Sequence, residues 1–446
     1  MRSRMAHVLI LLSLFALAGC GENALLPTAP SSLSPTTVPK PASPPPLSLY
    51  FSAMTPNASP DAPIEAVPQS AISALDANTG KLRWTYITGA QVQNVPVVDH
   101  DTLYVGADNQ TVYALNAGNG SVRWKASVGG EPHVITVQNG LVYGDIALNS
   151  GGRSTLGPIF ALDARNGSIA WRSQINGSFF GLIHGVVYVA TADNKLYALD
   201  AAHGSARWQF QMDYPFAGLK VVAEQVYLLA AHRASDAPNV VLYVLNASTG
   251  ALQWRYPAAR KDLENLDLID ADNGALYLLA SGQQNLAALP LALALNASDG
   301  SVLWQYQASG KSSSFTSSTL DNGTLYLGTT TGQLLALSEQ DGLVRWHTKI
   351  TSTMNIDLVH DGAIYLTLSN EGVTALKTSS GAVLWRYRSA DYVGISSAKD
   401  AALYGFSVSS SFDPDSHNYV LALNANNGSL LWSYDAGTGS IFPVLS

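Results

Sequence analysis

The stretch ALDANTGKLRW, residues 74–84, carries the pattern that decides the fold of this 446-residue chain. It ends in a glycine, three further residues and a tryptophan, and every tryptophan in the chain follows a glycine by four positions. The nine tryptophans are Trp84, Trp124, Trp171, Trp208, Trp254, Trp304, Trp346, Trp385 and Trp432. Successive tryptophans lie 37 to 50 residues apart, which is the period of a propeller blade or a similar array. The pattern therefore predicts a repeat architecture in which each tryptophan has the same structural position.

Each repeat is predicted to contain four short strands. Residues 95–128 show them as VPVV, TLYVG, TVYALNA and SVRWKASV, separated by the turn sequences HD, ADNQ and GNG. Short runs rich in Val, Tyr, Leu and Trp between Gly, Asn and Asp are typical of antiparallel strands joined by hairpins. No long apolar pattern of period 3.6 occurs beyond the first residues, so we expect an all-β protein with almost no helix.

Counting the strands predicts how the array closes. The segment LSLYFSA at 47–53 resembles a second strand without a first, and SIFPVLS at 440–446 resembles a first strand without a second. Pairing the two ends closes a ring and removes exposed sheet edges. Residues 47–446 are therefore predicted to form one β-propeller of nine four-stranded blades, with eight blades and one displaced repeat as the alternative.

The physical properties of its residues explain the pattern of the hairpin between the third and fourth strands. Glycine tolerates the positive φ of a tight turn, and Asn or Asp bonds the turn backbone. Tryptophan can bury a large face between blades, where a small alanine leaves room for the ring. This pattern resembles the tryptophan-docking motif of pyrroloquinoline quinone (PQQ)-type β-propellers across residues 47–446. The chain departs from it at Val244, which replaces the alanine, and at Ser338 and Lys377, which replace the acidic or amide residue.

The N-terminus indicates where the protein works. Two arginines precede an apolar run at residues 8–17, and Leu-Ala-Gly leads to Cys20, the sole cysteine. This segment is a secretory signal, too short to span a bilayer. Residues 1–19 resemble a bacterial lipoprotein signal, which implies cleavage before Cys20 and acylation of that cysteine; a plain signal peptide with an incidental cysteine is the alternative. By the same resemblance, Glu22 would permit export to an outer membrane.

The Pro/Ser/Thr-rich residues 20–46 are expected to form an extended tether.

Composition excludes several functions. Without the two signal arginines, the mature chain has 22 basic and 32 acidic residues, a net charge of −10. No basic cluster exceeds two adjacent residues, which argues against a nucleic-acid partner. The histidines show no metal-ligand spacing, and residues 413–418 lack the glycine and terminal glutamate of an EF-hand loop. We therefore predict no metal site, and a monomeric propeller without disulfides.

The family resemblance implies two possible roles. One is the quinoprotein dehydrogenases, which hold PQQ and calcium in the central channel with a stacking tryptophan and a disulfide of adjacent cysteines. The other is non-catalytic propellers such as the lipoprotein of the outer-membrane β-barrel assembly machinery. Here every tryptophan belongs to a docking hairpin, and Cys20 is assigned to the lipid anchor. We therefore predict no cofactor and no enzyme, but a membrane-anchored, extracytoplasmic scaffold that binds a protein of the cell envelope.

Two alternatives to the scaffold stay open. A surface binder of glycans or peptides could use aromatic side chains near the channel mouth, with Tyr214, Phe216 and Tyr392 as candidates. A PQQ-dependent dehydrogenase is the other alternative.

The loop lengths predict where a partner would bind. Loops between second and third strands share a face with the connections between blades, and the long insertions fall there, at 54–71, 146–158, 231–240, 281–291 and 408–419. Loops on a rigid ring commonly carry binding residues, although unselected drift in exposed loops is the alternative. The candidate partner contacts are His232, Arg233, Asp236, Arg260, Lys261, Asp262, Phe412, Asp413 and Asp415.

Overall fold

The structure is a computed structural model in which the chain divides into two compact units, Met1–Pro44 and Pro45–Ser446. Only parts of the second unit are described below. The described residues are 47–54, 70–92, 94–150, 153–232, 239–257, 263–282, 290–308, 314–350, 352–369, 371–409, 417–437, 441 and 443–446. Within these ranges every regular element is a strand, and no helix could cross a membrane.

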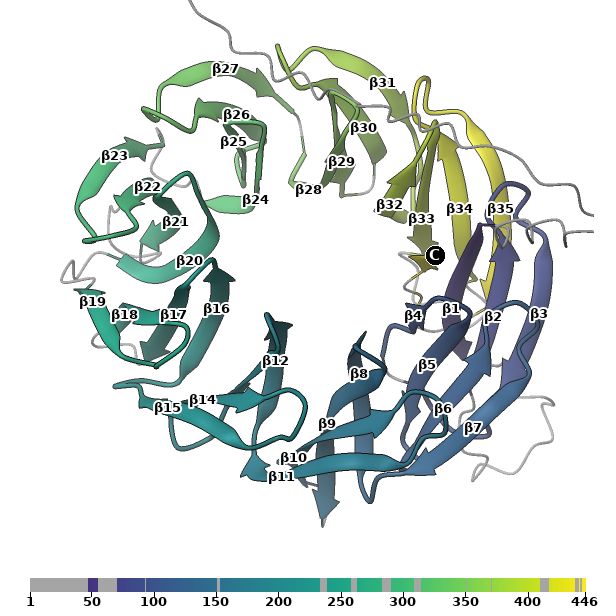
Figure 1. Ribbon diagram of the computed structural model, residues 1–446. Coiled ribbons are helices and arrows are strands. Elements are labelled where there is room, and N and C mark those ends of the chain that lie inside the picture. The colour runs from purple at the N-terminus through teal and green to yellow at the C-terminus, as the bar shows by residue number, and fades with distance from the viewer. Residues whose placement is uncertain are drawn as a thin grey trace, which may run out of the picture. The chain divides into compact units, whose positions relative to one another are not determined.

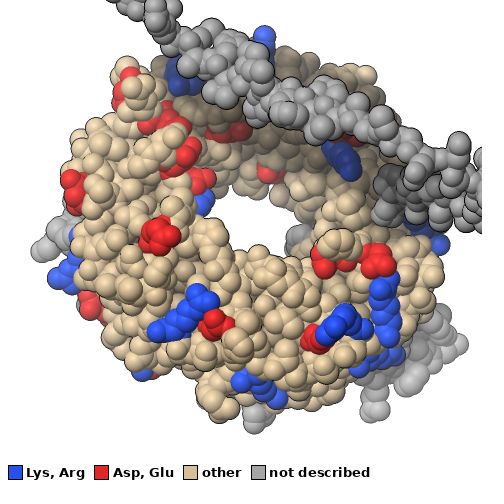
Figure 2. Space-filling view, in the orientation of Figure 1, with Lys and Arg blue, Asp and Glu red and all other residues tan. Residues whose placement is uncertain are grey.

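Nine four-stranded antiparallel sheets stand around a central opening and form a nine-bladed propeller (Figure 1). The space-filling view shows that the opening remains after side chains are added (Figure 2). Blade 1 contains β36, β1, β2 and β3, and blades 2 to 9 follow in chain order with four consecutive strands each. This result confirms the all-β propeller and selects nine blades over eight.

The two inner layers of strands lie nearest the opening. The innermost strands, from blade 1 to blade 9, are β36 (Val444–Leu445), β4 (Val97–Asp99), β8 (Glu131–Gln138), β12 (Ser178–Ile183), β16 (Phe216–Val222), β20 (Leu263–Asp272), β24 (Phe315–Asp321), β28 (Met354–His360) and β32 (Tyr392–Lys399). The second strands are β1 (Ser48–Met54), β5 (Thr102–Ala107), β9 (Leu141–Ser150), β13 (Val186–Ala190), β17 (Gln225–His232), β21 (Ala275–Gly282), β25 (Thr324–Thr329), β29 (Ala363–Leu368) and β33 (Ala402–Val408).

The two outer layers carry the docking hairpins. The third strands are β2 (Ser70–Asp76), β6 (Thr111–Asn116), β10 (Arg153–Asp163), β14 (Lys195–Asp200), β18 (Asn239–Asn246), β22 (Leu291–Asn296), β26 (Gln333–Ser338), β30 (Gly372–Lys377) and β34 (Asn418–Asn424). The outermost strands are β3 (Leu82–Ile87), β7 (Val122–Ser127), β11 (Ile169–Asn176), β15 (Ala206–Gln211), β19 (Leu252–Pro257), β23 (Val302–Gln307), β27 (Val344–Lys349), β31 (Val383–Tyr387) and β35 (Leu430–Gly437).

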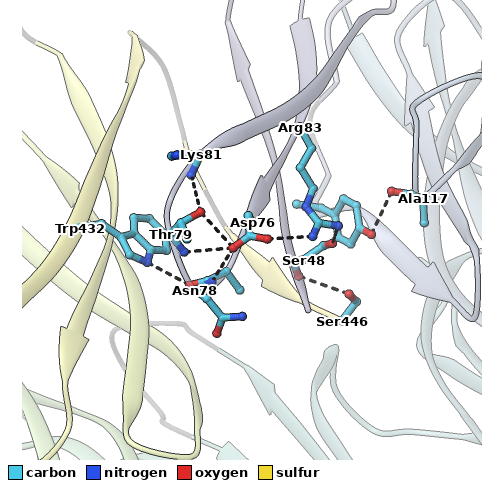
Figure 3. Close-up of polar contacts among 11 residues, drawn as sticks. Ser48, Asp76, Asn78, Thr79, Lys81, Arg83, Ala117, Trp432 and Ser446 are labelled. Carbon is cyan, nitrogen blue, oxygen red and sulfur yellow. Dashed lines mark hydrogen bonds and ion pairs between the residues drawn. The ribbon is translucent and has the colours of Figure 1, made fainter. Parts of the chain in front are cut away.

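The two ends of the folded chain close the ring as predicted. β36 pairs antiparallel with β1, so the last strand becomes the innermost strand of the first blade. The Ser446 backbone N–H donates to the Ser48 carbonyl at 3.1 Å, and the Ser446 hydroxyl lies 3.3 Å from the same oxygen (Figure 3). The closure hides the edge of β1, which would otherwise expose unpaired backbone groups.

Each tryptophan ties its blade to the next. The indole Nε1–H donates to a backbone carbonyl of the following blade in all nine cases, at 2.8 to 3.0 Å. The series closes on itself, because Trp432 of blade 9 donates to Ala77 of blade 1 (Figure 3). Within each blade the residue at the alanine position of the motif lies directly opposite the tryptophan, as Ala74 does opposite Trp84. The nine predicted docking residues therefore form nine equivalent interfaces.

The docking glycine serves the turn and the interface together. Gly120 has φ +72°, and a Cβ added to it would lie 2.6 Å from Cε3 of Trp84 in the preceding blade. The other eight docking glycines also have positive φ and the same close ring contact. The glycine N–H closes the turn onto the carbonyl four residues earlier even at Ser338 and Lys377. The two departures from the motif therefore leave the backbone turn intact.

One predicted loop is wrong. Residues 146–158 were expected to be an insertion loop, but β9 and β10 extend through most of them as a long hairpin. Asn149 and Ser154 pair across it, so the added residues lengthen two strands. The other four long insertions fall largely outside the described residues.

Replacing Gly120 with alanine should lower the melting temperature markedly. The added Cβ meets both an unfavourable positive φ and the Trp84 ring, and overpacking of this kind typically costs about 1–3 kcal/mol beyond the backbone strain. Thermal unfolding followed by circular dichroism measures the change. Gly140→Ala is the matched control, because Gly140 has φ +74° and no atom of the described residues lies within 4 Å of the point where its Cβ would stand. Equal losses in the two variants would show that the ring contact contributes nothing.

Candidate functional site

The antiparallel order of the strands gives the ring two unlike faces. First-to-second and third-to-fourth turns lie on one face, here called the hairpin face. Second-to-third turns and the connections between blades lie on the other, here called the connection face. Of the nine candidate partner contacts, only His232 is within the described residues, as the last residue of β17, where its backbone pairs with Asn239. The other eight lie outside the described residues, so their role stays a prediction.

The wall of the central opening changes character around the ring. Seven of the innermost strands contain a point where the pairing register skips one residue, which marks a β-bulge. In blades 3 to 9 the skipped residues are, in order, Ile135, Phe180, Ala217, Ile269, Thr316, Asp357 and Ser396, and the innermost strand of blade 6 skips a second residue, Glu264, near its start. Apart from Glu264, the skipped residues are thus apolar in blades 3 to 6 and polar in blades 7 to 9.

An apolar hollow of about 550 Å³ opens where blades 1, 2 and 3 meet. Val95 and Ile135 line it with side chains that are 44% and 37% exposed, and Val444 of the closing strand completes the wall. Asn94 also lines it, and its buried Nδ2 has no hydrogen-bond partner among the described residues. The hollow therefore combines an apolar surface with one unsatisfied donor.

His133 is the titratable group of this hollow. Its Nδ1 lies 2.8 Å from Oδ1 of Asp145, and this hydrogen bond raises the histidine pKa against the opposing effect of burial. The second oxygen of Asp145 accepts the Phe179 backbone N–H at 3.0 Å, which links blade 3 to blade 4. The aspartate therefore positions the histidine and joins two blades, so the pair has a structural use.

Asp357 plays a similar linking part between blades 8 and 9. Its Oδ2 accepts the Ile395 backbone N–H at 2.8 Å, and the Thr367 hydroxyl lies 2.5 Å from the same oxygen. Burial raises the pKa of this carboxyl to about 6, because desolvation of the charge outweighs both hydrogen bonds. The sequence offered no signal for this role, since the partner N–H belongs to the next repeat.

An ion pair joins the innermost strands of blades 5 and 6. Nζ of Lys220 lies 2.5 Å from Oδ1 of Asp270, and both side chains are about one-third exposed. On the hairpin face Asp270 also lines an acidic hollow of about 460 Å³ with Asp272 and Asp321. Nevertheless, no group of three His, Cys, Asp or Glu side chains with the geometry to hold a metal occurs in the described part of the chain.

The aromatic candidates for ligand binding are engaged in packing. The Phe216 ring stacks on Phe180 of the preceding blade with centroids 3.9 Å apart, and Tyr214 packs against the same hydrophobic cluster as Phe216. The ring of Tyr392 lies 6.2 Å from that of Phe406 within blade 9. Phe180 was not a candidate from the sequence, but it is 46% exposed, and its ring is accessible to a ligand. The three predicted residues do not form one site.

The nine-bladed ring belongs to a known family. A family model described as outer membrane protein assembly factor BamB matches residues 66–175, 155–318 and 291–440, which together span most of the chain. The chain therefore belongs to this family of PQQ-like β-propellers.

Individual relatives are distant. The crystal structure of BamB from Moraxella catarrhalis is 17% identical, with a TM-score of 0.43 over 70% of this chain and 94% of that chain. The computationally designed Ika8 protein is 11% identical, with a TM-score of 0.51 over 71% of this chain and 93% of its own. A europium-containing methanol dehydrogenase is 14% identical, with a TM-score of 0.40 over 70% and 82%. These likenesses concern the fold.

One curated protein shares a short segment. Tetrathionate hydrolase of Acidithiobacillus ferrooxidans is 32% identical over 66 residues, which is 15% of this chain. The match spans only 13% of the hydrolase, so the activity of that enzyme does not transfer to this chain.

Replacing Asp357 with asparagine should stabilise the protein at neutral pH. The folded-state pKa of about 6 exceeds the ordinary 3.8, so Asp357 binds its proton more tightly in the folded state, and stability falls as pH rises from 4 to 6. The amide oxygen can keep the contact with Ile395, and a shift of about two pKa units corresponds to up to about 3 kcal/mol at pH 8. Melting temperatures of both proteins at pH 4 and pH 8 measure the effect. A difference between them that does not change with pH would contradict it.

Proposed function

We propose that this protein is a lipid-anchored, extracytoplasmic propeller that binds a protein partner in the cell envelope and has no catalytic activity of its own. The observation that carries the proposal is the family match to an outer membrane protein assembly factor over most of the chain. A ring with two unlike faces suits a scaffold, because it holds loops from separate blades in fixed relative positions.

The use of the aromatic and titratable groups supports a non-catalytic role. All nine tryptophans donate their indole N–H to the next blade, so none is available to stack on a quinone in the channel. Asp145 and Asp357 both accept backbone N–H groups from neighbouring blades. These carboxylates hold the ring together, and such structural linking explains their hydrogen bonds without a reaction.

The proposed partner surface is the connection face. We assign to it the long insertions expected from the sequence and the candidate contacts His232, Arg233, Asp236, Arg260, Lys261, Asp262, Phe412, Asp413 and Asp415. By contrast, the hairpin face consists of short turns, and those between third and fourth strands are fixed by the docking motif. Binding residues can vary more freely on the connection face, because no tryptophan docks there.

Lipidation of Cys20 should be detectable directly. A bacterial culture expressing the full chain with an alkyne-labelled fatty acid should yield labelled protein that enters the detergent phase on phase separation. Cys20→Ala should lose the label completely, because no other cysteine can accept an acyl chain. Secretion of an unlabelled, water-soluble wild-type protein would contradict the anchor and favour a plain signal peptide.

A photo-crosslinking amino acid should identify the binding face. Placed at Lys261 or Asp413, it should give discrete crosslinked products with envelope proteins in native membranes, identified by mass spectrometry. Placed at Ala202 or Ser298, exposed turn positions on the hairpin face, it should give none of these products. The same partner crosslinked with equal yield from both faces, or from neither, would refute the assignment.

A further inference from the structure

A cationic hollow lies on the connection face between blades 7 and 8. It has a volume of about 620 Å³ and is lined by Lys349 at the end of β27, by Arg386 of β31, and by Arg388 directly after β31. The buried Leu368 and Ile350 contribute apolar surface. None of these residues was a candidate from the sequence, and none of them belongs to the long insertions.

The two arginines of the hollow stand apart from the other arginines of the ring. Within the described part of the chain, neither Arg386 nor Arg388 has a hydrogen-bond or ion-pair partner, although both are exposed and lie in an acidic protein. Each of the other arginines with a described side chain has at least one such partner. These are Arg83, Arg123, Arg165, Arg172, Arg207, Arg255 and Arg345. The hollow therefore presents two uncompensated guanidinium groups.

Comparison of the repeats shows that the arginine pair is special to blade 8. The two arginines stand one and three positions after Trp385, and the same positions hold Gln305 and Gln307 in blade 6. No other repeat carries two arginines at these positions. Because alternate residues of a strand share a face, and Trp385 docks onto blade 9, Arg386 faces the opposite way, toward blade 7. The repeat itself does not require the pair.

The remaining charges of the hollow leave it positive. Nζ of Lys349 donates to the Thr331 carbonyl, and the carboxylate of Glu371 accepts the Ser352 hydroxyl. Three cations thus face one carboxylate, and that carboxylate is already hydrogen-bonded. An anionic ligand could therefore bind both guanidinium groups without breaking an existing hydrogen bond or ion pair to a described residue.

We propose that this hollow binds an acidic, extended peptide segment of the protein partner. Arg386 lies on β31 and Arg388 directly after it, and two residues separated by one in an extended chain are about 7 Å apart along its direction, which matches the spacing of carboxylates on alternate residues of an extended peptide. Guanidinium groups bind carboxylates through paired, charge-assisted hydrogen bonds. The apolar surface of Leu368 and Ile350 suits aliphatic side chains between the acidic ones. This inference rests on the proposed function, because it names the chemistry of the partner.

A short peptide tests the subsite without the natural partner. The probe is fluorescein-labelled, end-capped Asp-Leu-Asp-Leu-Asp, and fluorescence anisotropy with the full chain gives its affinity. Arg386→Gln with Arg388→Gln, which copies the residues of blade 6, should weaken binding by roughly tenfold or more, because two charge-assisted contacts are lost. An Asn-Leu-Asn-Leu-Asn peptide should bind the wild-type chain equally weakly.

The matched control separates the site from general charge. Arg386→Gln and Arg255→Gln each remove one charge at the position after a docking tryptophan, in blades 8 and 5. Only the first should weaken binding of the acidic peptide. Equal effects of both variants, or no effect of the double variant, would overturn the proposal. So would arginine-dependent binding to phosphatidylglycerol vesicles with no binding to the peptide, which would assign the hollow to a lipid headgroup.

The outcome can be told apart from failure of the proposed function. If the peptide binds through the arginines but no envelope protein crosslinks to the connection face, the subsite stands and the scaffold role falls. If crosslinking persists unchanged in the double variant and the peptide does not bind, the scaffold role stands and the subsite falls. Circular dichroism of the double variant checks that the ring is intact, as expected for residues found at the same positions of another blade.

Discussion

The ring depends on one repeated contact between neighbouring blades. In it, the indole N–H of a tryptophan donates to a backbone carbonyl of the next blade, and the indole ring packs against the docking glycine of that blade. The same glycine forms the turn and receives the ring of the preceding tryptophan, so local chain geometry and inter-blade packing are one requirement. Nine such contacts connect head to tail, and the last, from Trp432 to Ala77, joins residues 355 positions apart in sequence. Blade number follows from the number of docking units, because each interface needs both a donor tryptophan and an acceptor turn.

Because the docking hairpins join the blades, the other strands of each blade can differ in sequence from one repeat to the next. The two inner layers of strands join neighbouring blades in different ways: Asp145 of a second strand and Asp357 of an innermost strand each accept a backbone N–H of the next blade, whereas Lys220 and Asp270 form an ion pair. The innermost strands also differ in the bulged residue, which is Phe180 in one blade and Ser396 in another. Since the docking hairpins recur in every blade, departures from the repeat mark the places where selection for binding can act.

The sequence predicted the features that repeat and missed those that do not. The fixed spacing between glycine and tryptophan was sufficient to predict nine hairpins. The unpaired strands expected at residues 47–53 and 440–446 were sufficient to predict that the ring closes through β36. Residues 146–158 were taken for a loop because strand lengthening and loop insertion both add polar residues between the same two strands. The pKa of Asp357 depends on burial against another repeat, which no local pattern records. The pair Arg386 and Arg388 did have a signal, visible when repeats are aligned on their tryptophans.

The same comparison bears on whether the channel is a reaction site. Asp145 and Asp357, on the two strand layers nearest the opening, accept hydrogen bonds from backbone groups of the next blade. Moving either carboxylate to act on a substrate would break a link between blades, so acid–base chemistry there would work against the integrity of the ring. The arginines between blades 7 and 8 have no such structural role, because no described residue of the ring pairs with their charged groups. The guanidinium groups of Arg386 and Arg388 on the connection face are therefore available to bind a ligand, whereas the two carboxylates nearer the channel join blades.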